Sequence, residues 1–318
     1  MTTLYYAHPV FLDHDPGPGH PERADRLRAV GAALADATLS DLERREPPRA
    51  EIAQIARVHP EPHVRAILDA VPESGYVRLD PDTVMSPASG EAALRAAGAL
   101  VAAVDAVATG EAQNAFCAVR PCGHHAEPTR PMGFCIFNNV AIGALHARAV
   151  HQHRRVAVVD FDVHHGNGTQ ASFAHDRDLF FASSHQYPFY PGTGASSETG
   201  VGNIVNEPLA AGTGSDEFRA AWANRILPAL DGFRPEFLLI SAGFDAHRAD
   251  PLAALNLVED DFVWVTREIL GIAAEHCSGR VVSVMEGGYD LDALGRSSVA
   301  HVRELVSARD TNTASSRG

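Results

Sequence analysis

Two carboxylates and a histidine stand at alternate positions near the middle of the chain. In the run 156–168, Asp160, Asp162 and His164 follow four apolar residues, and glycines come after them. Alternate side chains of a strand point to one face, so these three groups would leave the same side together. Buried carboxylates are costly unless they are paired or bind a metal. The pattern predicts a metal site, although a helix-capping Asp with surface histidines would explain part of it.

A second apolar run, 237–247, also ends in a carboxylate, Asp245. Alone, Asp245 would be interpreted as a helix cap or a turn residue. Beside the first run it is a candidate third ligand. One His and two carboxylates would leave zinc an open position for water and substrate, as a catalytic site requires. Oxygen ligands also keep iron, cobalt and manganese as alternatives.

Two further runs carry groups suited to proton transfer and oxyanion binding. His124 and His125 are adjacent, and they follow a predicted strand that ends near Val119. Tandem histidines beside a metal site favour general acid–base catalysis near neutral pH. Tyr289 follows a strand and two glycines, and its hydroxyl could stabilise an oxyanion. A lone histidine or tyrosine is more often structural, so the catalytic interpretation depends on all these runs together.

Short β-rich segments alternate with longer helical patterns along the chain. Strands are predicted at 4–7, 115–119, 156–162, 179–182, 237–241 and 281–285. Helices are predicted at 22–37, 87–109, 139–153, 215–230, 259–277 and 291–308. The helix at 87–109 would have Ser86 as its N-cap and Pro87 as its first residue. The alternation predicts one doubly wound α/β domain with a mainly parallel sheet flanked by helices, with ligands beyond the carboxyl ends of the strands.

Composition limits the class of protein. The chain has 318 residues and a net charge of −14, and 45% of its residues are hydrophobic, as in a globular domain with a full core. The acidic balance argues against nucleic acid, which needs clustered Lys and Arg, and suits a cationic substrate. No apolar run reaches the ~20 residues of a membrane helix. The start of the chain has no signal-peptide pattern, so we expect a cytoplasmic location without membrane contact.

No repeat or linker divides the chain. We therefore expect residues 1–309 to form a single catalytic domain and the small polar residues 310–318 to be a disordered tail. The four cysteines include no Cys-x-x-Cys pair, which favours reduced thiols over a disulfide framework or a cysteine zinc site. The sequence shows no pattern typical of a subunit interface. The oligomeric state is therefore left open, and a homo-oligomer is one of the alternatives.

Together, the four polar runs resemble the histone deacetylase family within the arginase–deacetylase superfamily. They occur in the family's order between residues 120 and 290, and weaker similarity at 14–27 and 82–97 extends the resemblance over most of the chain. Asn167 and Glu286 resemble the class II and bacterial amidohydrolase-like members. The implied fold is that of the arginase–deacetylase superfamily.

The resemblance implies a catalytic set around one Zn²⁺ ion. Asp162, His164 and Asp245 match the zinc ligands. The other matched residues are the tandem His124 and His125, their partners Asp160 and Asn167, and Tyr289, which binds the substrate carbonyl. The implied reaction is hydrolysis of an acyl amide by a metal-activated water, with proton transfer by His125. The expected substrate is an acetylated amine: acetyl-lysine, an acetylpolyamine or a small acyl amide.

The resemblance also implies a substrate tunnel and a potassium site. Gly133, Phe134, Tyr190 and Leu252 match tunnel residues, and Tyr190 stands where relatives often have Phe. The potassium site would use Asp160, Asp162, His164, Ser183 and Ser184. Cys122 stands where relatives often have a second Pro, which puts substrate specificity in doubt.

Two alternatives differ in class from a zinc deacylase. A binuclear manganese ureohydrolase of the same superfamily would need a bridging carboxylate two places after His164, where this chain has Gly166. A non-catalytic acyl-ligand binder or regulatory protein on the same fold would be expected to have lost a metal ligand, a catalytic His or the Tyr. All of those residues are present here, which favours the enzyme.

Overall fold

A computed structural model describes residues 2–35, 39 and 42–315, with the side chains of 309–315 left out. Within these residues, eight strands form one sheet in the order β2-β1-β5-β10-β9-β6-β7-β8. Their bounds are β1 Thr3–Tyr6, β2 Leu42–Arg45, β5 Asn114–Cys117, β6 Val156–Asp160, β7 Leu179–Gln186, β8 Ile204–Leu209, β9 Phe237–Ala242 and β10 Val281–Met285. All neighbouring pairs are parallel. The predicted α/β class is confirmed.

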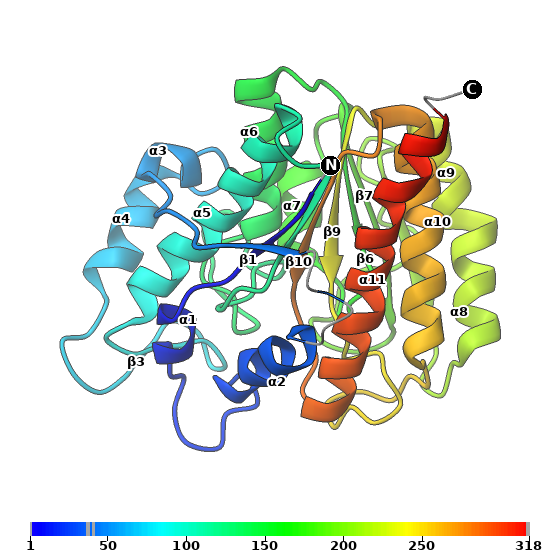
Figure 1. Ribbon diagram of the computed structural model, residues 1–318. Helices are drawn as coiled ribbons and strands as arrows, with labels where there is room; N and C mark the ends of the chain where they lie inside the picture. Colours follow the sequence, from blue (N-terminus) through cyan, green and yellow to red (C-terminus); the bar gives the residue numbers. More distant parts are fainter. Residues whose placement is uncertain (1, 36–38, 40–41, 316–318) are drawn as a thin grey trace.

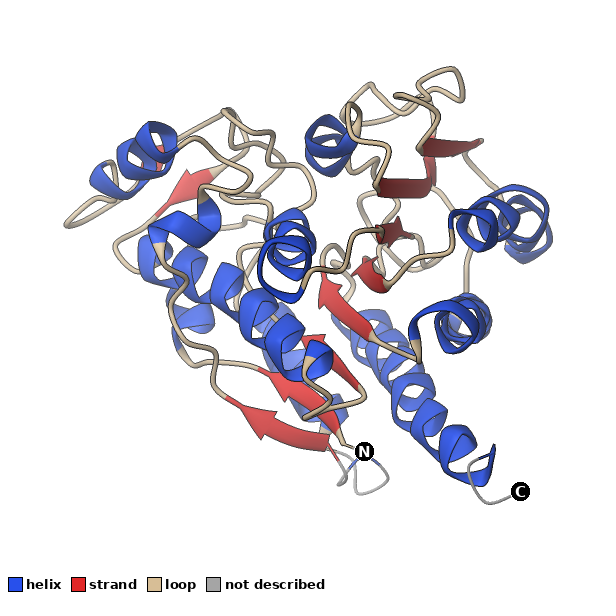
Figure 2. Ribbon diagram, turned by 90° about the horizontal axis from the view of Figure 1, so that it is seen from above, coloured by secondary structure: helices blue, strands red, loops and turns tan. Residues whose placement is uncertain are grey.

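Helices cover both faces of the sheet (Figures 1 and 2). Helices α5 (Ser89–Ala108) and α6 (Asn139–His151) pack on one face, and α10 (Glu259–Cys277) and α11 (Leu291–Ser315) pack on the other. Every residue of β5, β6, β9 and β10 is buried. Double coverage explains why these strands are apolar at successive positions and were recognisable in the sequence.

Small residues let α5 and α6 approach closely. A Cβ atom added at Gly143 of α6 would lie 3.2 Å from the Cβ of Leu100 on α5 and 3.1 Å from a methyl of Leu239 on β9. A larger side chain at position 143 would therefore push the two helices apart or lift α6 from the sheet.

The remaining helices are shorter. Their bounds are α1 Val10–Asp13, α2 Asp25–Leu34, α3 Ile52–Ile55, α4 Glu61–Asp69, α7 Asn167–Phe173, α8 Ser215–Ala221 and α9 Leu227–Phe233. Some of them pack on the long helices, as α2 does on α11. A two-stranded hairpin pairs β3 (Val77–Arg78) with β4 (Val84–Met85). The helices α1, α3, α4 and α7, the hairpin and the edge strands β2 and β8 were not predicted.

Several predicted boundaries differ from the structure, among them the strands predicted at 115–119, 156–162 and 179–182, and three differences have a local cause. The helix predicted at 87–109 begins at Ser89 with Ala88 as its N-cap, because Ser86 and Ser89 close a turn through a 3.0 Å backbone hydrogen bond. The single helix predicted at 215–230 contains a π-helical turn at Trp222–Ile226. Pro228 follows this turn and has no N–H to donate back into it, which accounts for the widening.

The third difference is at the carboxyl end, where α11 continues to Ser315 beyond its predicted end at 308. Positions 309–315 contain neither Pro nor Gly, so no residue there interrupts the helix. The predicted tail at 310–318 therefore overlaps the last helical turns, and residues 316–318 lie outside the described part.

In the described residues, no helix combines the length and the apolar character needed to cross a membrane.

Candidate active site

The polar groups singled out in the sequence follow four strands that are adjacent in the sheet: β5, β10, β9 and β6. Since all four strands are parallel, their carboxyl ends lie at one edge, and the segments that follow them meet there. This edge is where open α/β sheets bind ligands.

Asp162, His164 and Asp245 converge at this edge. Nδ1 of His164 lies 3.2 Å from Oδ1 of Asp162 and 3.1 Å from Oδ2 of Asp245. One ligand-type atom from each of the three residues lies within 4.8 Å of the others. A Cβ atom at Gly243 or Gly287 would overlap the Asp162 carboxylate. The three side chains are therefore tightly packed against one another, and their convergence agrees with the sequence prediction.

The reason for this convergence differs from the sequence argument. Strand β6 ends at Asp160, so Asp162 and His164 are not on a pleated strand. Backbone N–H groups hold the carboxylates instead. His164 donates to Asp162 over 2.8 Å, and Val163 donates to Asp245 over 3.0 Å. A tight turn of hydrogen-bonded backbone, and not strand alternation, aims these side chains.

The charge balance of the three groups favours a bound cation. Burial raises the pKa of Asp245, with the Asp162 charge adding to the effect. Although burial opposes it, hydrogen bonds to both carboxylates raise the pKa of His164 to about 10. Without a metal, the proton on Nδ1 of His164 lies between the two carboxylates. A bound cation would take the place of that proton, and the donor set suits zinc or another divalent transition metal.

The tandem histidines are held by different partners. Nδ1 of His124 lies 2.9 Å from Oδ2 of Asp160, and Nδ1 of His125 lies 2.8 Å from Oδ1 of Asn167. The two rings are 4.0 Å apart between centroids. The backbone N–H of His124 donates to the buried Glu286 carboxylate over 3.2 Å. All the predicted partners of the tandem pair are therefore in place.

The two histidines differ in protonation. Burial favours the neutral form of both, but the carboxylates of Asp160 and Asp162 raise the pKa of His124 well above its usual range. Burial lowers the pKa of His125 well below that range, and nearby positive charge on His124 and His164 adds to the effect. These shifts favour a protonated His124 and a neutral His125.

Tyr289 is placed by two charged residues that sequence reasoning did not single out. The guanidinium of Arg26 lies 4.8 Å from the Tyr289 ring centroid, and its Nε donates to the Gly288 carbonyl over 2.6 Å. The Tyr289 backbone N–H donates to Oδ2 of Asp250 over 2.6 Å. Buried Glu22 forms an ion pair with Arg26 at 3.2 Å. The sequence analysis placed Glu22 and Arg26 in a predicted helix at 22–37 and in the segment of weaker family similarity at 14–27, but neither pattern assigned them to the site.

A narrow pocket of about 120 Å³ leads to these groups. It is lined by Asp82, His125, Gly133, Phe134, His164, Tyr190, Leu252 and Tyr289. The structure thus brings all four predicted tunnel residues together with His125, His164 and Tyr289.

Two aromatic residues form walls of the pocket. The Tyr190 ring meets His125 edge-on at 5.2 Å, and the Phe134 ring meets Tyr289 edge-on at 6.1 Å. Gly133 has φ +59°, and a Cβ there would lie 2.3 Å from the His125 ring. Position 133 therefore requires glycine both for its backbone conformation and for its contact with His125. Asp82, which the resemblance did not assign, accepts a 2.9 Å hydrogen bond from the Gly133 N–H.

The predicted potassium residues lie on the neighbouring strands β6 and β7 or, for Asp162 and His164, directly after β6. Asp160 of β6 pairs in register with Ser183 of β7. The Ser183 hydroxyl lies 2.9 Å from Nδ1 of His185, and the Ser184 hydroxyl accepts a 2.9 Å hydrogen bond from Trp222. The potassium assignment continues to rest on the family resemblance.

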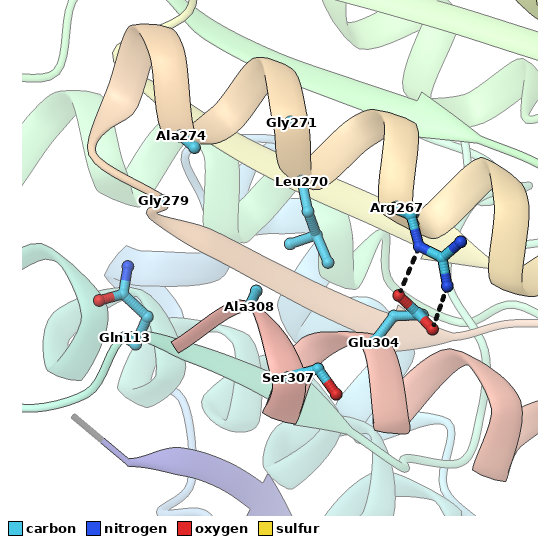
Figure 3. A pocket seen from close by; sticks show the side chains of 9 residues that line it. All are labelled: Gln113, Arg267, Leu270, Gly271, Ala274, Gly279, Glu304, Ser307 and Ala308. Atoms are coloured by element: carbon cyan, nitrogen blue, oxygen red, sulfur yellow. Dashed lines mark hydrogen bonds and ion pairs between the residues drawn. The ribbon is translucent and has the colours of Figure 1, made fainter. Parts of the chain in front are cut away.

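A larger groove, of about 430 Å³, lies between α10 and α11 (Figure 3). Gln113 and Gly279 line it, and they precede β5 and β10, so it is at the opposite edge of the sheet. Its described lining includes apolar Leu270 and the ion pair of Arg267 with Glu304, at 3.0 Å. Its lining mixes apolar and charged residues, as an ordinary protein surface does, and includes none of the candidate metal ligands or catalytic residues.

Comparison with known proteins agrees with the fold and the site. Residues 20–305 match the histone deacetylase domain family. The crystal structure of the HDA15 HD domain superposes with a TM-score of 0.90 at 34% identity, covering 96% of this chain and 88% of that one.

Curated relatives give the same result. A probable deacetylase of Methanothermobacter thermautotrophicus is 44% identical over 299 residues, which cover 90% of this chain and 86% of the relative. The histone deacetylase-like amidohydrolase of Pseudomonas aeruginosa is 38% identical over 297 residues, covering 92% and 78%.

The eight-stranded parallel sheet flanked by helices is that of the arginase–deacetylase fold. The chain belongs to the histone deacetylase family, and within that fold it is a hydrolase of the deacetylase type.

Proposed function

We propose that this protein is a zinc-dependent deacylase that hydrolyses the amide bond of an acetylated amine. The main observation behind the proposal is that one small pocket is lined by His164, His125 and Tyr289. Of these, His164 belongs to the group of possible metal ligands with Asp162 and Asp245. Asp162, His164 and Asp245 would hold the metal. Bound there, zinc lowers the pKa of a water molecule and polarises the acyl oxygen.

His125 is the proposed proton carrier, and its hydrogen bonds support this role. The amide nitrogen of Asn167 donates to the Glu127 carboxylate over 2.8 Å, which leaves Oδ1 of Asn167 facing Nδ1 of His125. Because Oδ1 can only accept, Nδ1 of His125 carries a proton and its Nε2 keeps a free lone pair. Nε2 takes the proton from the attacking water and then gives it to the leaving amine nitrogen.

The other residues act without gaining or losing a proton. His124 stays cationic beside Asp160 and favours negative charge developing nearby. Burial raises the pKa of the Tyr289 phenol well above its usual range, so the hydroxyl remains protonated and can donate to the oxyanion. Glu286, Arg26 and Asp250 hold the backbone of these two segments in position.

A binuclear manganese site is less well supported. A Cβ atom at Gly166 would lie 2.5 Å from the Asp160 carboxylate and 3.1 Å from the Phe181 ring. A bridging carboxylate at position 166 would not fit without moving Asp160 away from His124. The arrangement therefore favours a single metal at this centre.

The substrate class follows from the pocket. Its small volume suits an acyl group on an unbranched amine, and the Asp82 carboxylate in its lining suits a cationic or amide-bearing remainder. Acetyl-lysine peptides, acetylpolyamines and small acyl amides all meet this description. The test is acetate release by the zinc-loaded protein from one substrate of each kind, with chelation as the control. Zinc-loaded protein that releases no acetate from any of the three would contradict the proposal.

A further inference from the structure

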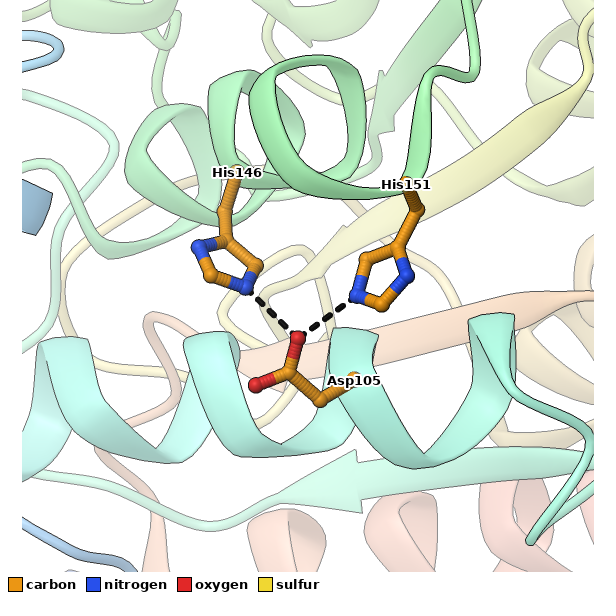
Figure 4. Close-up of side chains that lie close together, drawn as sticks. All are labelled: Asp105, His146 and His151. Carbon is orange, nitrogen blue, oxygen red and sulfur yellow. Dashed lines mark hydrogen bonds and ion pairs between the residues drawn. The ribbon is translucent and has the colours of Figure 1, made fainter.

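A second cluster of metal-ligand side chains lies between helices α5 and α6 (Figure 4). Oδ1 of Asp105 on α5 lies 2.7 Å from Nε2 of His146 and 2.6 Å from Nε2 of His151, both on α6. One ligand atom from each lies within 4.8 Å of the others. We propose that Asp105, His146 and His151 form a binding site for Zn²⁺ or a similar transition-metal ion, separate from the catalytic centre.

The cluster is remote from the catalytic centre. Helix α6 ends at His151, shortly before β6 begins at Val156, so this end of the helix lies at the amino ends of the strands. The catalytic residues lie beyond the carboxyl ends of the same strands. A metal at the second site would thus join α5 to α6 without contacting substrate, and this inference does not depend on the proposed function.

The donor set fits the chemistry of such an ion. Two imidazole nitrogens and one carboxylate oxygen are common zinc ligands, and they also suit Co²⁺, Ni²⁺ and Cu²⁺. With metal–ligand bonds of about 2.1 Å, neighbouring tetrahedral ligands stand about 3.4 Å apart. Asp105 must therefore move away by about 0.7 Å from His146 and about 0.8 Å from His151.

The three side chains differ in solvent exposure, and the most exposed one is the carboxylate that has to move. The His146 side chain is 3% exposed and the His151 side chain 16%, whereas Asp105 is 47% exposed. The two histidines are therefore held by the fold, and the carboxylate on the solvent side can adjust. The same open side gives the ion a path of entry and leaves room for water as a fourth ligand.

Arg57 provides a specific test of the ligand atoms. Its NH1 group lies 2.9 Å from Nδ1 of His146. Because a guanidinium can only donate, Nδ1 holds a lone pair and Nε2 carries the proton that faces Asp105. Binding of a metal at Nε2 moves this proton to Nδ1, where it would meet Arg57. The ion must therefore displace Arg57, and Arg57→Met should bind the ion several-fold more tightly.

The experiment is a calorimetric titration of Zn²⁺ into protein whose catalytic centre is already saturated. We expect one further zinc per chain, at least tenfold weaker binding in Asp105→Asn and in His151→Gln, and unchanged deacylase activity in both. If the catalytic centre holds no zinc, the same titration shows the second site alone, so failure of the proposed function would be recognised separately.

Two histidines outside the cluster serve as controls. His175→Gln removes an exposed histidine, and His276→Gln alters another surface group, with Asp231 and Glu275, that contains ligand-type atoms. Both variants should retain the second zinc. The proposal is overturned if the wild type binds no second zinc, if His151→Gln retains it, if His276→Gln loses it, or if Arg57→Met binds it more weakly.

Discussion

Asn167 presents its amide oxygen, and not its amide nitrogen, to Nδ1 of His125. The two atoms are 2.8 Å apart, and the orientation follows because the amide nitrogen donates to Glu127, whose carboxylate can only accept. A residue outside the pocket thereby decides which nitrogen of His125 holds a free lone pair. Glu127 is a positioning residue that acts through Asn167.

Replacement of Glu127 should therefore impair proton transfer without removing a catalytic group. Glu127→Gln can donate to Asn167, so its amide can turn and offer N–H to His125, which puts the proton on Nε2. We expect kcat to fall about tenfold with little change in KM, given that general base catalysis contributes about 10²–10⁴-fold. Steady-state kinetics over a range of pH would measure this.

The matched control is Glu73→Gln, which neutralises an exposed carboxylate. It should behave as the wild type. Equal kcat values for Glu127→Gln and the wild type would show that Glu127 does not set the orientation of Asn167.

Tyr289→Phe removes the hydroxyl proposed to donate to the oxyanion and keeps the ring that packs on Arg26 and Phe134. We expect a loss of about 100-fold or more in kcat, the usual effect of removing one such donor, with zinc content and melting temperature unchanged. Metal analysis and kinetics on the same preparation would test this. Near-normal turnover would exclude Tyr289 from the catalytic set.

Removal of the catalytic metal should lower stability as well as activity. Without a cation, the buried carboxylates of Asp162 and Asp245 repel each other, and burial already raises the pKa of Asp245. Zinc at 100 times its Kd should stabilise the fold by about 2.7 kcal/mol relative to chelated protein. Thermal unfolding before and after chelation would measure the change.

His151→Gln is a useful background for the chelation experiment, because it lacks the proposed second site. Stabilisation by zinc in that variant reports the catalytic centre alone. A melting temperature that does not respond to zinc there would contradict the assignment of Asp162, His164 and Asp245 as ligands.

The sequence predicted that the proposed metal ligands and Tyr289 lie together, because local pattern and fold agree there. Asp162, His164, Asp245 and Tyr289 each follow a buried apolar strand, and parallel strands place such residues at one edge of the sheet. The sequence argument nevertheless attributed the side-chain orientation of Asp162 and His164 to strand alternation. In the structure, hydrogen bonds from backbone N–H groups hold the carboxylates of this cluster in place. The positions were predictable, and the turn geometry was not.

The supporting residues could not be predicted, because their contacts are distant in sequence. Arg26 bonds the carbonyl of Gly288, 262 residues away, and Glu127 bonds Asn167, 40 residues away. No periodicity links such partners. The edge strand Leu42–Arg45 was missed for another reason, since three of its four residues are charged and Leu42 is its single apolar residue.

The last prediction concerns acid stability and uses His301, a fully buried histidine that belongs to neither metal cluster. Its Nδ1 lies 2.7 Å from the Thr266 hydroxyl and its Nε2 lies 2.8 Å from the Ser283 hydroxyl. Burial lowers the pKa of His301 to about 3, against about 6.5 in the unfolded chain. The neutral ring therefore contributes stability that is fully present above pH 6.5 and is lost as pH falls toward 3.

His301→Gln keeps hydrogen-bonding groups at this position but cannot titrate. At pH 7.5 the variant should be less stable than the wild type. As pH falls from 6.5, the difference should shrink by about 1.4 kcal/mol per pH unit, because only the wild type has to keep His301 neutral. Other buried histidines are common to both proteins and cancel in the comparison. Urea unfolding at several pH values would measure the difference, and a gap that stays constant from pH 7.5 to 4.5 would show that His301 is already protonated or not buried in solution.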